Sequence, residues 1–194
     1  MFASQEWIGK ADPLMPIWRL ALRNKVRVAP GNRLEVARNI RIRHCQISIK
    51  GTGNRLVIEP GANLRGVQLE IDGEGCELRI GAETVIGEGC YLSCRESGTR
   101  LVIGRDGMLS RNVKVMTSDG HEILAGGQRI NPARSITVGD HVWLADSAIV
   151  LKGATIGDNA VVGIASLVTG KVEAGCVVAG NPARVVKEGV TWLR

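Results

Sequence analysis

Aliphatic residues recur at every sixth position in the C-terminal half of this 194-residue chain. The stretch from Ile136 to Lys171 divides into six consecutive hexads, and the third residue of each hexad is aliphatic. These residues are Val138, Leu144, Val150, Ile156, Val162 and Val168. An amphipathic helix has apolar residues every three or four positions and a regular strand every two, whereas a period of six is typical of a short strand and a corner repeated many times. The pattern predicts a chain that coils into a prism around a narrow apolar lumen.

A second set of mostly small residues lies two positions before each aliphatic residue, where a second inward side chain fits at each corner without overfilling the lumen. It comprises Ile136, Val142, Ala148, Ala154, Ala160 and Ser166. Glycines directly follow three of the aliphatic residues, at Gly139, Gly157 and Gly163. We expect them at tight corners, where a side chain would crowd the turn.

The hexad continues from Val26 to Val115 but changes phase. Ile58 and Leu64 share one register, Ile80, Ile86 and Leu92 a second, and Ile103, Leu109 and Val115 a third. Glycine-rich turn signals at 51–54, 72–75 and 96–99 lie where the phase changes. Each change therefore indicates an insertion or deletion at a corner and not a change of fold.

This repeat resembles that of the hexapeptide-repeat proteins, which fold as left-handed parallel β-helices and are mostly acyltransferases that use acetyl-CoA or a related thioester. The resemblance implies eighteen residues per coil, so that Val138 stacks under Ile156, Leu144 under Val162, and Val150 under Val168. The left-handedness rests on the resemblance alone, because crossovers between parallel strands are usually right-handed. We expect an all-β protein with a β-helix over 26–180, an N-terminal cap over 1–25 and a C-terminal tail over 181–194.

The expected cap differs in composition from the repeat. Trp18 lies among aliphatic residues and is followed by Arg19, Arg23 and Lys25, a pattern that favours a short amphipathic helix. Such a segment covers the open end of a solenoid, where strand edges would otherwise be exposed. Tryptophan combined with basic residues is also typical of a segment that lies at a membrane surface. Both interpretations remain open for residues 1–25.

Composition limits the remaining possibilities. Aromatic residues make up 3% of the chain and glycine accounts for 25 residues, which suits a narrow solenoid better than a sandwich or a helical bundle. The chain is long enough for one domain. The five cysteines include no C-x-x-C pair, so we expect buried thiols and neither a disulfide framework nor a zinc site. They are Cys45, Cys76, Cys90, Cys94 and Cys176.

Charge and targeting signals point to the cytosol. No secretory signal and no run of eighteen apolar residues occurs, so we expect a cytoplasmic protein, or one peripheral to the inner face of the membrane. The net charge of +6 suits CoA phosphates, an acidic glycan or an anionic membrane surface. No basic patch interleaved with aromatic residues occurs, so a nucleic-acid partner is not expected.

One segment is too polar and glycine-rich to fill the lumen. It lies at about 118–135, contains His121, and is expected to leave the wall as a loop. Its strings S-D-G-H and Q-R-I-N, followed by G-D-H-V-W, resemble those of bacterial polysaccharide O-acetyltransferases and of maltose and galactoside acetyltransferases. The resemblance makes His121 the catalytic base. Imidazole titrates near neutral pH, as a base that accepts a proton from a sugar hydroxyl requires.

Five further residues are candidates beside His121. Asp119 or Glu122 is close enough in sequence to orient the ring, and the sequence does not decide between them. Trp143 alternates with inward residues and therefore points outward, where it contacts either a ligand or a neighbouring subunit. Arg129 and Arg134 in the loop suggest an acidic acceptor sugar.

The C-terminal strings suggest the donor site. The string G-N-P-A-R-V resembles the closing motif of the family, in which basic residues reach the CoA phosphates. By this resemblance the cofactor-binding residues are Ala145, Asp146, Gly163, Ile164, Thr169, Lys171, Arg184 and Lys187. The usual lysine after Thr169 is replaced by Gly170, so the cation moves to Lys171.

Together these features predict an acetyl-CoA-dependent O-acetyltransferase that acts directly on a sugar hydroxyl of a bacterial surface polysaccharide or its precursor. Family members are usually homotrimers with clefts between neighbouring prisms, so we expect a homotrimer without a metal. Two alternatives remain: a metalloenzyme similar to γ-carbonic anhydrase, and a non-catalytic β-helix scaffold. The acceptor sugar and the acyl chain length are not determined by the sequence.

Overall fold

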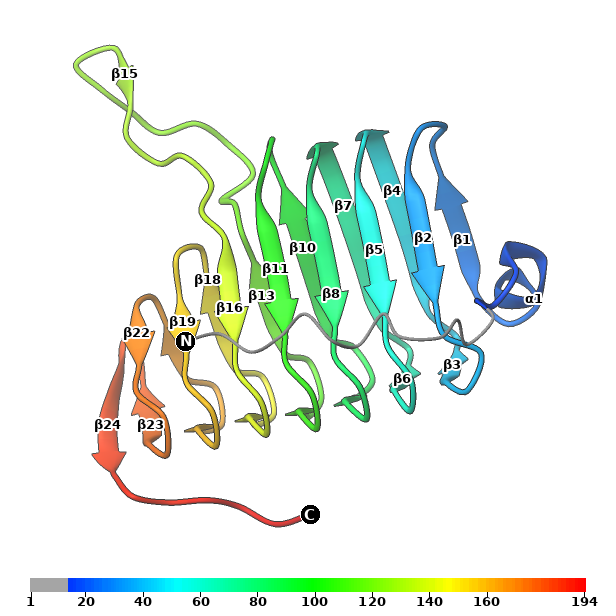
Figure 1. The fold of residues 1–194 in the computed structure, drawn as a ribbon. Coiled ribbons are helices and arrows are strands. Elements are labelled where there is room, and N and C mark those ends of the chain that lie inside the picture. Colours follow the sequence, from blue (N-terminus) through cyan, green and yellow to red (C-terminus); the bar gives the residue numbers. More distant parts are fainter. Residues whose placement is uncertain (1–13) are drawn as a thin grey trace, which may run out of the picture.

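The computed structural model describes residues 14–194 as a β-helix with three faces of stacked parallel strands (Figure 1). The chain visits the first, second and third face in turn and then returns to the first. The predicted all-β left-handed β-helix is thereby confirmed. Residues 1–13, which include most of the expected cap, lie outside the described residues.

Each face contains seven parallel strands. The first face comprises β1 (Lys25–Val28), β4 (Gln46–Thr52), β7 (Gln68–Glu74), β10 (Tyr91–Arg95), β13 (Lys114–Met116), β18 (Ile149–Leu151) and β21 (Leu167–Val168). The second face comprises β2 (Arg33–Val36), β5 (Arg55–Ile58), β8 (Glu77–Ile80), β11 (Arg100–Ile103), β16 (Ile136–Val138), β19 (Thr155–Ile156) and β22 (Lys171–Val172). The third face comprises β3 (Arg41–Arg43), β6 (Asn63–Arg65), β9 (Val85–Ile86), β12 (Met108–Leu109), β17 (Trp143–Leu144), β20 (Val161–Val162) and β23 (Val177–Gly180).

Four further elements lie outside these faces of the prism. The helix α1 (Ile17–Ala21) lies at its N-terminal end, and β24 (Ala183–Lys187) pairs antiparallel with β23 at its C-terminal end (Figure 1). The antiparallel hairpin of β14 (Leu124–Ala125) and β15 (Gln128–Arg129) projects from one corner. No helix among residues 14–194 is long and apolar enough to cross a membrane.

The predicted stacking of aliphatic residues is confirmed in register. Val138 pairs with Ile156, Leu144 with Val162, and Val150 with Val168, and all six side chains are buried in one continuous core. All five cysteines are buried free thiols, as expected. Because every coil buries the same kinds of aliphatic side chain, the lumen is stabilised along its whole length by the same apolar burial.

The changes of phase have one structural cause. Strands paired on the first face are 22 residues apart at Gln46 and Gln68, but 18 residues apart at Ile149 and Leu167. The extra residues fall at the corner between the first and second faces, at the turns near 51–54, 72–75 and 96–99. The 118–135 loop leaves from this corner as well, one coil later. The site loop is therefore the largest of a series of insertions at one edge of the prism.

The glycines that follow inward aliphatic residues are required mainly by the contact between coils, whereas the sequence predicts that the tight corner requires them. Gly104 and Gly139 do not have positive φ values. A Cβ at Gly104 would lie 2.4 Å from the carbonyl oxygen of Gly139 in the next coil. The glycines therefore permit close approach of successive coils, and conformational freedom at the turn is not what requires them.

The C-terminal tail folds back along the prism. The ring of Trp192 stacks on His141 with centroids 4.4 Å apart, and its Nε1 donates to the carbonyl oxygen of His141. Arg194 forms an ion pair with Asp106 at 2.9 Å. His141 occupies a corner with φ of 53° and contacts Asp106 through Nδ1. This histidine is thus part of the corner and tail structure.

We predict that Gly104→Ala lowers the free energy of unfolding by about 2 kcal/mol or more, because its Cβ would overlap rigid backbone of the adjacent coil. Gly107→Ala is the matched control, since a Cβ there would lie no closer than 3.5 Å to any neighbour. Thermal unfolding followed by circular dichroism measures both. Equal stability of the two variants would contradict the close-approach explanation.

Candidate active site

The 118–135 loop is an ordered hairpin anchored at its base. Gly126 and Gly127 form its tip, with φ values of 56° and 76° that suit the two-residue turn of a tight hairpin. The loop extends beyond the edge of the prism between β13 and β16 (Figure 1). The side chain of His121 is exposed near its base.

Buried Asn131 holds the two arms of the loop together. Its Oδ1 accepts a hydrogen bond from the Ile123 amide at 2.6 Å, and its Nδ2 donates to the His121 carbonyl oxygen at 2.8 Å. Nδ2 also donates to Asp119 at 2.7 Å. The backbone of His121 is therefore fixed, whereas its imidazole makes no hydrogen bond within residues 14–194.

The two carboxylates predicted to orient His121 have other partners. Asp119 forms an ion pair with Lys152, whose side chain is only 13% exposed, and the pKa of Asp119 is lowered by the hydrogen bonds from Lys152 and Asn131. Glu122 lies 3.7 Å from Arg129. Both acids are close to His121 in sequence, but among the described residues neither forms a hydrogen bond with its ring.

A pocket of about 340 Å³ lies against His121. Its lining consists of Asp72, Arg95, Glu96, Ser118, Gly120, His121, Glu122 and Arg129. Arg95 donates to both carboxylate oxygens of Glu70 at 3.0 Å, and Arg129 donates to Glu96 at 2.7 Å. The Nε atoms of both arginines are buried without a hydrogen-bond partner among residues 14–194. These two N–H groups are covered by the protein and therefore do not face the pocket, which the two arginines line with other atoms.

Glu96 joins the loop to the preceding coil. It accepts hydrogen bonds from Arg129, from the hydroxyl of Ser118 at 2.6 Å, and from the amide of Ala133 at 3.4 Å. The hydrogen bond from Arg129 is the main reason that the pKa of Glu96 falls to about 2. Glu96 is therefore ionised whenever the protein is folded near neutral pH.

The predicted acceptor arginines occupy different settings. Arg129 is half-buried and held by Glu96, so it stabilises the loop in addition to lining the pocket. Arg134 is exposed, and its backbone amide donates to the Thr117 carbonyl oxygen. Only Arg129 lies beside His121 in the pocket.

Trp143 is half-buried on the third face, as its predicted outward direction requires. Its Nε1 donates to the hydroxyl of Ser110 at 3.0 Å, and its ring lies 6.0 Å from that of Trp192. The loop of His121 leaves the corner between the first and second faces. Within one chain, Trp143 and His121 are therefore on different sides of the prism.

Four of the predicted cofactor residues share one edge. Ala145, Asp146, Gly163 and Ile164 lie at the corner between the third and first faces in successive coils, where the Ala165 amide donates to the Asp146 carbonyl oxygen. The pKa of Asp146 is lowered by the hydrogen bond from the Arg111 amide. Ile164 is 74% exposed. We call this edge, formed by Ala145, Asp146, Gly163 and Ile164, the ledge; its most exposed side chain is that of Ile164.

The other four predicted cofactor residues lie further toward the C-terminal end. Thr169 and Lys171 lie at the opposite edge of the first face, and Lys171 pairs with Glu173 at 2.7 Å. Arg184 and Lys187 are exposed on β24. The structure thus places the eight residues in the last coils of the prism but divides them between two of its edges and the added strand β24.

Sequence reasoning did not identify Arg95, Glu96, Asn131 and Lys152. Asn131 acts within the loop itself, through hydrogen bonds to Asp119, His121 and Ile123. The other three depend on contacts between coils, because the preceding coil supplies Arg95 and Glu96 and the following coil supplies Lys152. The pairing of Tyr91 with Lys114 places Arg95 and Glu96 beneath the start of the loop. That register was the signal that could have revealed them.

Metal-binding geometry is not present in the described part of the chain. No three His, Cys, Asp or Glu side chains of residues 14–194 are grouped to hold a metal ion. The two other histidines, His44 and His141, occupy corners with positive φ values.

Comparison with known proteins places the fold and this loop in context. A polysialic acid O-acetyltransferase from Escherichia coli O1:K1 is 32% identical over 123 residues, which cover 62% of this chain and 39% of that protein. The crystal structure of the polySia-specific acetyltransferase NeuO matches with a TM-score of 0.77 and 30% identity, covering 84% of this chain and 74% of that one. A hexapeptide-repeat acetyltransferase from Vibrio cholerae, solved with acetyl-CoA, shares the fold at 21% identity and a TM-score of 0.50.

The chain belongs to the hexapeptide-repeat, left-handed β-helix acetyltransferases. The match spans about two fifths of the length of the E. coli relative. No family model matches the chain.

We predict that acid loosens the 118–135 loop. Because the pKa of Glu96 in the folded protein, about 2, lies below its ordinary value of 4.5, its stabilising effect is complete above pH 4.5 and is lost as the pH falls toward 2. Amide hydrogen exchange at Ile123 and Ile130, expressed as protection factors, is expected to show at least about a fivefold loss of protection over this range. In Glu96→Gln most of the loss should already be present at neutral pH, and the remaining change between pH 4.5 and 2, which comes from protonation of Asp119, should be smaller. The same pH dependence in both proteins would refute the role of Glu96.

Proposed function

We propose that the protein is an acetyl-CoA-dependent O-acetyltransferase that acetylates a sugar hydroxyl of a bacterial surface polysaccharide or its precursor, with His121 as the base. The observation that carries this proposal is an imidazole with no hydrogen-bond partner among residues 14–194, on a backbone fixed by Asn131, beside a pocket lined by two arginines. The names of the relatives, which include polysialic acid O-acetyltransferases, support the same acceptor class.

The reaction requires few groups from the protein. Acetyl-CoA supplies an activated acetyl thioester. The imidazole of His121 accepts the proton of the sugar hydroxyl as the hydroxyl oxygen bonds to the acetyl carbon and the carbon–sulfur bond breaks. The same proton then passes to the departing thiolate, so His121 ends the cycle neutral. The ester product is uncharged at the new bond, and no residue is consumed.

The environment of the ring suits this role. Asp119 and Glu122 are engaged by cations, so neither is free to hold the proton in place of His121. The imidazole is also exposed, which leaves it accessible to an acceptor. In this proposal His121 acts as the base while Asp119 keeps its ion pair with Lys152.

An acidic acceptor is supported by the two arginines at the pocket. Arg95 and Arg129 both line the pocket and place positive charge beside His121. A sugar carboxylate is the group that an arginine fork binds best. Arg95 and Arg129 are therefore the proposed acceptor-binding pair, with Arg134 at the outer rim.

Donor binding is assigned to the C-terminal end of the prism. We assign the pantetheine arm to the ledge at Ala145, Asp146, Gly163 and Ile164, and the phosphates to the cations of the final coil and β24. The Vibrio cholerae neighbour solved with acetyl-CoA supports this donor class. Synthesis of the CoA thioester and of sugar precursors in the cytosol fits a cytoplasmic location.

The active site is proposed to form between subunits of a homotrimer. The first face carries half-buried apolar side chains at Ile149 and Leu167, and the third face carries Trp143 and Val161. A contact between two different faces is heterologous and can close into a ring. Trp143 of one subunit would then contact the acceptor beside His121 of the next, which accounts for their separation within one chain.

The donor and base assignments are tested together by two variants. His121→Ala is expected to lower kcat by about 10² to 10⁴ while leaving acetyl-CoA binding unchanged, because general base catalysis contributes an effect of that size. Arg184→Ala is expected to weaken acetyl-CoA binding by about tenfold, because it removes one charge-assisted contact. Calorimetric titration measures binding, and thiol release with an acidic oligosaccharide acceptor measures turnover.

Two outcomes would contradict the proposal. Absence of acetyl-CoA binding to the folded protein would contradict the transferase function. Full turnover by His121→Ala would contradict the assignment of His121 as the base. Arg100→Ala, an exposed cation on the second face, is the matched control for Arg184→Ala and should bind as the unsubstituted protein does.

The shared site predicts complementation between two inactive variants. When His121→Ala and Trp143→Ala chains are co-expressed and assemble at random, about a quarter of the interfaces combine an intact His121 with an intact Trp143. Activity of the mixed population should therefore recover to about a quarter of that of the unsubstituted protein. If the mixture is no more active than either variant alone, the site lies within one subunit.

A further inference from the structure

The positive charge of the chain is concentrated in one short segment. Residues 14–43 contain eight lysines and arginines and a single acid, Glu35, whereas residues 44–194 contain sixteen basic and sixteen acidic residues. The eight cations are Arg19, Arg23, Lys25, Arg27, Arg33, Arg38, Arg41 and Arg43. The net charge of the described chain is therefore carried by its N-terminal end, far from the predicted donor site.

These cations surround the end of the prism. Lys25 and Arg27 point outward from the first face, Arg33 from the second, and Arg41 and Arg43 from the third. All eight side chains are exposed, and none forms an ion pair with an acidic side chain of residues 14–194. Glu35 is already bound to Arg55 at 2.7 Å. The charge at this end is thus not neutralised within the described chain.

Exposed apolar side chains lie beside the cations. Leu14 and Ile17 are about half exposed, Trp18 is 68% exposed and Leu22 is 73% exposed, all in or next to α1. Leu20 on the same helix is buried and packs into the core. The helix therefore covers the lumen with one side chain and presents its larger apolar groups outward.

The helix is held firmly against the first coil. Asn24 Nδ2 donates to the carbonyl oxygens of Leu20 at 2.8 Å and Ile42 at 3.3 Å, and its Oδ1 accepts from the amide of Cys45 at 3.0 Å. The Met15 amide donates to the carbonyl oxygen of Val36. Because the backbone that carries the exposed apolar groups is already fixed, binding of a partner does not have the entropic cost of ordering it.

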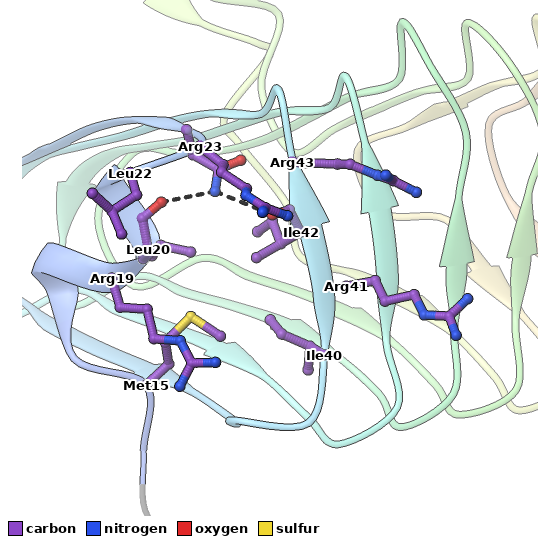
Figure 2. Close-up of a pocket in the computed structure, with 10 residues that line it drawn as sticks. Met15, Arg19, Leu20, Leu22, Arg23, Ile40, Arg41, Ile42 and Arg43 are labelled. Atoms are coloured by element: carbon purple, nitrogen blue, oxygen red, sulfur yellow. Dashed lines mark hydrogen bonds between the residues drawn. The ribbon is translucent and has the colours of Figure 1, made fainter.

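A pocket of about 480 Å³ lies between α1 and β3. Its apolar lining includes Met15, Leu20, Leu22, Ile40 and Ile42, and its basic lining consists of Arg19, Arg23, Arg41 and Arg43. Figure 2 shows the side chains of Arg41 and Arg43 extending from β3 in the same direction. Four arginines and five apolar residues thus line the pocket, and the guanidinium groups of Arg41 and Arg43 are directed away from α1.

We propose that this N-terminal end docks on the surface of an anionic phospholipid bilayer. Four cations at an apolar pocket suit lipid phosphates above acyl chains, and Trp18 with Leu22 suits the boundary between headgroups and chains. A nucleic acid or a soluble acidic glycan would satisfy the arginines but would leave Leu14, Ile17 and Leu22 exposed to water. Docking does not depend on the transfer reaction, and it would hold the enzyme at the membrane surface.

The test uses the full-length protein and sedimentation with vesicles. The protein is expected to sediment with phosphatidylcholine vesicles that contain about 30% phosphatidylglycerol, and not with pure phosphatidylcholine. Arg41→Gln/Arg43→Gln should weaken binding about thirtyfold, because each basic residue near an anionic surface contributes about fivefold. Trp18→Ala/Leu22→Ala, which keeps every charge, should weaken it about tenfold or more.

The matched control is Arg100→Gln/Arg105→Gln, which removes two exposed cations far from α1 and should bind as the unsubstituted protein does. Circular dichroism confirms that each variant is folded. Equal weakening by the control would show that net charge alone drives binding and would overturn the docking surface. Binding to a soluble acidic polysaccharide without binding to vesicles would overturn it as well, and would make this end a glycan site. Acetyl-CoA binding and turnover in solution should be unchanged in Arg41→Gln/Arg43→Gln, so failure here and failure of the proposed function are distinguishable.

Discussion

Inward aliphatic side chains, stacked from one coil to the next, hold the whole molecule in register. Each coil is stable only because its neighbours cover its apolar groups, so all other features of the protein are built on the outside of this column. Gly104 and Gly139 let the coils approach closely enough for backbone hydrogen bonds to form between them. The lumen therefore sets both the spacing of the coils and the positions from which loops can leave.

The same constraint explains why the candidate site lies where it does. Residues that do not fit the lumen must leave at a corner, and in this chain the insertions accumulate at the corner between the first and second faces. The turn at 96–99 and the 118–135 loop are successive members of this series. Glu96 in the first binds Arg129 in the second, so a small insertion in one coil supports the large one in the next. The support is electrostatic, and the same hydrogen bond from Arg129 lowers the pKa of Glu96.

The two ends of the column have different chemical character. The C-terminal end carries the residues proposed for the donor, together with the tail that stacks Trp192 on His141. The N-terminal end carries seven units of net positive charge over residues 14–43 and several exposed apolar side chains around α1. A rigid column keeps these two ends apart, so that one can contact a surface while the other binds a soluble donor.

The period of six by itself determined that the chain coils into a prism, because no other regular structure buries every sixth residue on one line, whereas the hand of the coil came from the resemblance. The register of Val138 on Ile156, the loop at 118–135 and the candidate base His121 also followed from the linear pattern and the resemblance. The partners of the loop did not. Arg95, Glu96 and Lys152 are separated from it by one coil. The coil length varies from 16 to 23 residues and reaches 35 where the loop is inserted, so their contacts depend on corner insertions that the sequence does not measure precisely. Likewise, the binding of Asp119 by Lys152 instead of His121 was decided by packing, since proximity in sequence does not determine which charged group a side chain meets in space.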